Sequence, residues 1–170
     1  MRFWHFEPRR RKVGAAMKRV RLPLALTGLM ALSLLTGCQE ELPPELKGPV
    51  SGVQYDCKQA GEYEPAAAAV VTKADLDGDG KDDYVLDYGK SCKAQRELYC
   101  NKEGCSFDIY ASSTGLMLGG SFKGIAWRAE RVDSKTQLIV TRPGENCGKT
   151  WKDLCETSYQ WSGDAFEPLP

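Results

Sequence analysis

Six cysteines constrain the fold of this chain more than any other feature of the sequence. They follow a seventh at position 38, and they are Cys57, Cys92, Cys100, Cys105, Cys147 and Cys155. An even number in a small exported domain predicts disulfides, whereas a thiolate metal cluster would normally show Cys-x-x-Cys spacing, which is missing. Six cysteines allow 15 pairings. Because loop closure favours near neighbours, we expect Cys100–Cys105 and Cys147–Cys155, which leaves Cys57–Cys92.

The N-terminal segment has the organisation of an export signal. Three basic residues, at positions 18, 19 and 21, precede an apolar stretch of 14 uncharged residues at 22–35. A membrane-spanning helix needs about 20 residues, and a shorter stretch after basic residues is typical of a secretory signal. Met17 starts a better-proportioned signal than Met1 does, which suggests that residues 1–16 belong to a mis-called start.

The signal ends in the letters LTGC, which resemble the lipobox of bacterial lipoproteins. In that family the cysteine receives diacylglycerol and becomes the new N-terminus. The resemblance implies that residues 1–37 are removed and that lipid on Cys38 holds an exported protein in the membrane of the cell envelope. Gln39, in place of the aspartate that keeps such proteins in the inner membrane, favours the outer membrane if the bacterium has two. The alternatives are an uncleaved anchor, or an ordinary signal followed by an ordinary thiol.

The rest of the chain is long enough for one domain. Residues 38–50 are polar and contain proline, so we expect a tether there and a folded domain over residues 51–170. The first 37 residues hold 8 of the 23 Lys and Arg but 1 of the 23 acidic residues, so residues 38–170 carry 15 positive and 22 negative groups, a net charge of −7. Such a surface repels phosphate backbones, and we expect no binding to nucleic acid.

The expected mature domain contains no histidine, because His5 lies in the removed segment. A Ser-His-Asp or Cys-His nucleophile and the usual catalytic zinc sites are therefore excluded. Carboxylate chemistry remains, since glycan hydrolysis needs no histidine. The sequence thus favours a protein that is not an enzyme.

Strand-like runs dominate the domain and predict a mainly β fold, a small antiparallel sheet or sandwich cross-linked by disulfides. Runs rich in β-branched and aromatic residues occupy 53–57, 68–72, 83–88, 106–112 and 136–142. We expect 116–122 to pair with 124–132, and 156–166 to form a hairpin. No window shows convincing helical periodicity. The aromatic residues either form the core or line a platform for a ligand: Tyr84, Phe107, Phe122, Trp127, Trp151 and Trp161.

An acidic loop over residues 75–83 is the strongest candidate site. Residues 74–85 read ADLDGDGKDDYV, with acids at alternate positions and Gly80 permitting a sharp turn. Oxygen cages for Ca²⁺ need this kind of convergence. The expected ligands are Asp75, Asp77, Asp79, Lys81 (through its backbone carbonyl) and Asp83. An EF-hand would require glutamate at its twelfth position, where Leu86 stands.

The spacing Asp-x-Asp-x-Asp-Gly-x-x-Asp resembles the calcium loop of FG-GAP and VCBS-type repeats, which links two β-strands. That resemblance implies Ca²⁺ and an extracellular or periplasmic binding protein. The sequence holds one copy of this loop and lacks the Phe-Gly…Gly-Ala-Pro repeat. The resemblance therefore implies the metal loop and not a propeller. The competing interpretation is a solvated Asp-Gly turn. Against it, four carboxylates within nine residues repel one another, which a divalent cation relieves.

The sequence favours a membrane-anchored binding or structural module with a structural Ca²⁺. Its partner would be an envelope protein or a glycan. The alternatives are an inhibitor of a periplasmic enzyme, an assembly factor that pairs through an exposed strand edge, and a small glycan hydrolase. Candidate acids for the hydrolase are Asp87, Glu97, Asp108, Glu130 and Asp133.

Overall fold

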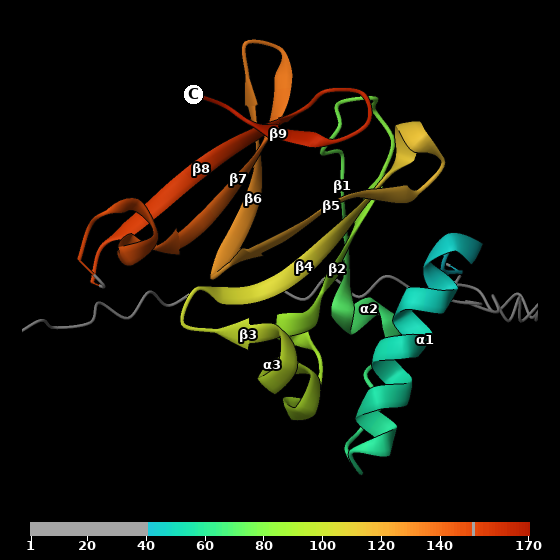
Figure 1. The fold of residues 1–170 in the computed structure, drawn as a ribbon. Coiled ribbons are helices and arrows are strands. Elements are labelled where there is room, and N and C mark those ends of the chain that lie inside the picture. Colours follow the sequence, from blue (N-terminus) through green and yellow to red (C-terminus); the bar gives the residue numbers. More distant parts are fainter. Residues whose placement is uncertain (1–40, 151) are drawn as a thin grey trace, which may run out of the picture. The chain divides into compact units, whose positions relative to one another are not determined.

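The computed structural model describes residues 41–150 and 152–170, so the expected signal, Cys38 and Trp151 lie outside the described part. The fold is mainly β, as predicted (Figure 1). The helical segments are α1 Pro44–Gln59, α2 Ala67–Val70, η1 Tyr88–Lys90, α3 Lys93–Tyr99, η2 Ser112–Thr114 and η3 Gly144–Cys147. The strands are β1 Val71–Ala74, β2 Asp83–Asp87, β3 Cys100–Asn101, β4 Gly104–Ala111, β5 Met117–Gly124, β6 Ala126–Val132, β7 Lys135–Pro143, β8 Leu154–Trp161 and β9 Phe166–Pro168. None of the described helices combines the length and apolarity that crossing a bilayer requires.

The strands form two antiparallel sheets. The first has the order β1-β2-β4-β3, with β5 also paired to β4, and the second has the order β6-β7-β8-β9. The expected hairpin over 156–166 is confirmed by the pairing of β8 with β9. The expected pairing of 116–122 with 124–132 is wrong, because β5 pairs with β4 and β6 pairs with β7.

Gly124 and Ile125 explain that error, because the chain passes between the sheets there without reversing. The backbone N–H of Ile125 donates to the carbonyl oxygen of Thr141 on β7. A Cβ atom on Gly124 would lie 2.7 Å from that same oxygen, so glycine permits the close approach. Strands β5 and β6 therefore follow each other around a corner without pairing, and they pair with β4 and β7 instead.

The main core lies between the two sheets. It contains buried residues from both sheets and from the loop between β1 and β2: Leu76, Val85, Phe107, Ile109, Leu138, Val140, Tyr159 and Phe166. Phe122, Trp127 and Trp161 pack against this cluster, so most of the aromatic residues serve the core and not a ligand platform. Tyr84 is the exception. It neighbours the buried Val85 on β2, and alternation along a strand places it on the outer face of the sheet.

Helix α1 covers part of that outer face, and it corrects two expectations. Residues 53–57 were expected to form a strand, and residues 44–50 were expected to belong to the tether, but both segments are helical. Leu46, Val50, Val53 and Cys57 are buried at spacings of four, three and four, which is one face of a helix. Gly48, Pro49 and Gly52 are weak helix formers that obscure this pattern; tertiary packing overrides their preferences.

All three predicted disulfides are confirmed. Cys57–Cys92 links α1 to the residue before α3, Cys100–Cys105 links the residue after α3 to β4, and Cys147–Cys155 links η3 to β8. Helix α3 has seven residues, too few for stability in isolation. Two disulfides hold it, one at each end.

Candidate metal centre

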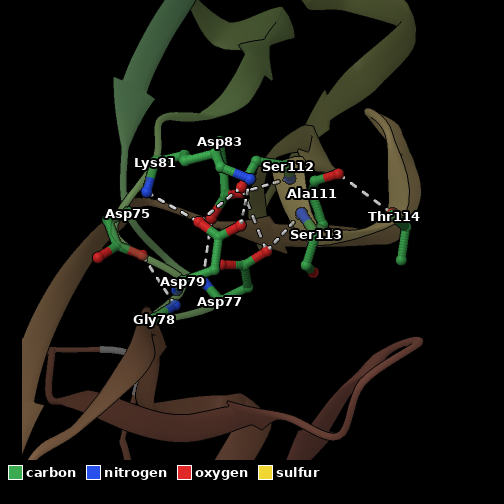
Figure 2. A network of polar contacts seen from close by, with 10 residues as sticks. All are labelled: Asp75, Asp77, Gly78, Asp79, Lys81, Asp83, Ala111, Ser112, Ser113 and Thr114. Atoms are coloured by element: carbon green, nitrogen blue, oxygen red, sulfur yellow. Dashed lines mark hydrogen bonds and ion pairs between the residues drawn. The ribbon is translucent and has the colours of Figure 1, made fainter.

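The acidic loop connects β1 to β2, as the sequence predicted, and Figure 2 shows its polar contacts with residues 111–114. Gly78 and Gly80 have φ angles of +83° and +85°, in the left-handed region that other residues rarely adopt. Leu76 is fully buried in the core between the sheets and fixes the start of the loop. The side chains of Asp75 and Asp77, on either side of Leu76, are thereby directed away from the core.

Asp83 organises the loop from within. Its side chain is fully buried, and its carboxylate accepts three backbone hydrogen bonds. Oδ2 accepts from Leu76 N–H at 2.6 Å and Asp77 N–H at 2.9 Å, and Oδ1 accepts from Ser112 N–H at 2.7 Å. Burial raises the pKa of Asp83 above its ordinary value, although these donors oppose the shift. The neighbouring Asp82 is exposed, so the structure distinguishes the two adjacent acids.

Asp77 joins the loop to η2. Its Oδ2 accepts from Ser113 N–H at 3.0 Å, and its Oδ1 accepts from Asp79 N–H at 3.0 Å. Burial favours the protonated carboxyl, but the hydrogen bonds from Ser113 and Asp79 outweigh it and lower the pKa of Asp77. Asp77 therefore offers a charged carboxylate as a possible metal ligand beside the buried Asp83.

Asp75, Asp77 and Asp83 form the group that can hold a metal ion. One carboxylate oxygen from each lies within 4.8 Å of the others. Calcium–oxygen distances are about 2.3–2.6 Å, so two ligands of one Ca²⁺ lie up to about 5 Å apart, and the observed spacing fits. Each carboxylate also keeps acceptor capacity: Asp83 Oδ1 accepts one hydrogen bond, and Asp75 accepts its one from Gly78 N–H at 2.8 Å.

Asp79 lies outside that group of carboxylates, and the backbone carbonyl of Lys81 stays a predicted ligand. Asp79 Oδ1 accepts from Lys81 N–H at 2.8 Å and from the Ser112 hydroxyl at 2.9 Å. The Lys81 ammonium lies 3.6 Å from Asp79 Oδ2. The carboxylate of Asp79 thus contacts Lys81 and Ser112, and its role as a metal ligand stays a prediction.

Ser112 and Ser113 belong to the site and were missed by the sequence analysis. They follow β4, and the register that pairs Tyr84 with Tyr110 brings the end of β4 beside the start of β2. Nothing in the local sequence marks this neighbourhood. Only the pairing of β2 with β4 reveals it. Continuing their register places residue 111 opposite residue 83, with residue 112 directly after it.

The five acids considered for a hydrolase lie on separate elements with separate partners. Asp87 accepts from Gly89 N–H, Asp108 accepts from the hydroxyls of Tyr88 and Ser121, and Asp133 occupies the turn after β6. Glu97 pairs with Lys93 on α3, and Glu130 pairs with Arg128 on β6. The contacts of Asp87, Asp108, Glu97 and Glu130 are those of structural residues.

Comparison of the chain with protein-family models, curated proteins and solved structures gave no match. The interpretation of the loop therefore rests on its own residues and geometry.

Proposed function

We propose that the protein is a lipid-anchored component of the cell envelope whose β-domain binds a structural Ca²⁺ at the β1–β2 loop. In this role it is a non-catalytic binding or structural module. The observation that carries the proposal is the convergence of Asp75, Asp77 and Asp83 within 4.8 Å. Three carboxylates at that spacing suit a hard divalent cation with oxygen ligands, and backbone carbonyls and water complete such shells.

The ion would act on stability and not on chemistry. The loop binds η2 through Asp77 and Asp83, so it links the β1–β2 connection to the end of β4. A bound cation offsets the repulsion among the three carboxylates and holds that link in one geometry. Loops of this type bind Ca²⁺ with dissociation constants of about 10⁻⁴–10⁻³ M, which suits an exported protein in millimolar calcium.

Two features support export and anchoring. The LTGC sequence ends at Cys38 directly after an apolar signal-like stretch. The three disulfides favour an oxidising compartment, where such bonds persist. Lipid on Cys38 would then hold the domain at the membrane.

The anchoring is tested by Cys38→Ala in the producing cell. We expect the protein to leave the membrane fraction, with a matched Cys38→Ser variant behaving in the same way because neither side chain accepts the thioether-linked lipid. Unchanged membrane fractionation of both variants would contradict anchoring through this residue.

The ion is tested by thermal unfolding in millimolar Ca²⁺ and in chelator. Saturation near ten times the dissociation constant stabilises by about 1–2 kcal/mol, or roughly 4–8 °C. We expect Asp77→Asn to abolish that shift. Asp82→Asn removes the same charge from an exposed residue of the same loop and should retain it. Equal calcium shifts in the two variants would contradict the site.

A further inference from the structure

A groove of about 720 Å³ lies where the chain enters the described fold. Leu42 and Pro43, ahead of α1, form one side together with Ala67 of α2. Lys73 of β1 and Tyr84 of β2 contribute the surface of the first sheet. The groove therefore joins the first described residues of the chain to the outer face of that sheet.

The outer face continues beyond the groove as a row of side chains across four strands. Lys73 pairs with Tyr84, Tyr84 with Tyr110, and Tyr110 with Leu118. Residues directly opposite each other in antiparallel strands lie on the same face. The Lys73 ammonium lies over the Tyr84 ring, 5.2 Å from its centre, and Leu118 is 55% exposed. We call these four residues the outer row.

Helix α1 packs over the neighbouring row and reaches the outer row at Tyr110. Val50 and Val53 of α1 pack with the buried Leu86, whose partner on β1 is Val71. Leu42 and Tyr110 both pack against this cluster, one from the entering chain and one from the outer row. The outer row, in which Leu118 is exposed and the other three residues are half-buried, thus combines tyrosine, lysine and leucine near the first described residues.

The length of chain before this surface limits how far it can lie from a lipid on Cys38. Glu41 follows Cys38 by three residues, which span at most about 11 Å. The headgroup layer on each side of a bilayer is about 5–8 Å thick. With the acyl chains in the hydrocarbon, Glu41 must therefore lie within or just outside the headgroups. Its charge is offset there by the Lys47 ammonium, 2.6 Å away.

We propose that the outer row and the adjoining groove form the surface that faces the lipid headgroups of the anchoring bilayer. The inference rests on the proposed lipid at Cys38. Tyrosine prefers the boundary between hydrocarbon and water, and lysine pairs with headgroup phosphates while its alkyl stem contacts apolar groups. The folded domain begins at Pro44, so the anchor is too short to let this face turn far from the membrane.

The test uses the full lipidated chain reconstituted in phosphatidylethanolamine–phosphatidylglycerol vesicles, with and without bromine on the acyl chains, which quenches nearby tryptophan. Leu118→Trp is compared with Leu154→Trp, because both leucines are 55% exposed. Leu154 begins β8, and that end of the strand and α1 lie on opposite sides of the fold in Figure 1. The unsubstituted chain supplies the background emission of the native tryptophans.

We expect the emission added by Leu118→Trp to shift to shorter wavelength and to be largely lost in brominated vesicles, while that of Leu154→Trp stays unquenched. Flotation of the vesicles tests the lipid anchor separately from the membrane-facing surface. A chain that does not float with them contradicts the lipid anchor and this inference together. A chain that floats while both tryptophans respond equally contradicts the membrane-facing surface alone.

Discussion

The surroundings of the β2–β4 pair are stabilised by different chemistry at its two ends. At one end, β4 begins beside Cys105 and β2 leads towards Cys92, and both cysteines form disulfides around α3. At the other end, β2 begins at Asp83 and β4 leads into Ser112, and the contact is a carboxylate that accepts a backbone N–H. The covalent end is independent of ions, whereas the acidic end depends on how its charge is balanced.

The comparison shows that this small domain is stabilised by disulfides in one region and by the charge balance of carboxylates in another. Disulfides hold short helices that could not persist alone, and they act chiefly by restricting the unfolded chain. The acidic loop instead gathers three carboxylates whose repulsion grows as they converge. We therefore expect reductant to destabilise the covalent end and chelator to destabilise the acidic end. Neither treatment should affect the opposite end.

Leu46→Ala should have the largest effect and tests whether residues 44–50 belong to the covalent end. Leu46 is fully buried, so its truncation leaves a cavity and should lower the free energy of unfolding by about 2–5 kcal/mol. Leu98→Ala is the control, since Leu98 on α3 is 74% exposed and should change it by less than about 0.5 kcal/mol. Denaturant unfolding measures both free energies. Equally small effects of the two variants would indicate that residues 44–50 form a tether and not part of the folded domain.

Removing a disulfide should have the next largest effect, and its size should follow the loop it closes. Replacing both Cys57 and Cys92 by serine opens a separation of 35 residues, and replacing Cys147 and Cys155 opens one of 8. Typical losses are about 2–4 kcal/mol, with the longer loop costing about 1 kcal/mol more. Both losses should be the same with calcium and with chelator. A loss at Cys57–Cys92 that vanishes in chelator would show that the two ends are coupled.

Asp79→Ala should have the smallest effect and distinguishes the sequence motif from the geometry. The motif makes Asp79 a ligand, but its carboxylate faces Lys81 and Ser112. We expect this variant to retain most of the calcium-dependent rise in melting temperature that Asp77→Asn loses. If both variants abolish the rise, the loop rearranges around the ion and Asp79 joins the ligands.

Local chemistry was predictable from the sequence, and contacts between distant segments were not. The alternating acids before β2 and the near-neighbour cysteine pairs carry their geometry in their spacing. The face of α1 was obscured because Pro49 and two glycines weaken the helical signal, which only packing against Leu86 restores. The partners of the acidic loop at Ser112 and Ser113 depend on strand register, which no short window of sequence contains.

The most direct test of the calcium site is a titration of the disulfide-bonded protein with CaCl₂, followed residue by residue in NMR spectra. We predict saturable shifts at the backbone amides of Asp77 and Ser113, with a dissociation constant of about 10⁻⁴–10⁻³ M. Asp82→Asn should leave them unchanged, and Asp75→Asn should weaken or remove them. Shifts that are absent, or that grow without saturation over the whole acidic surface, would contradict a calcium site in this loop.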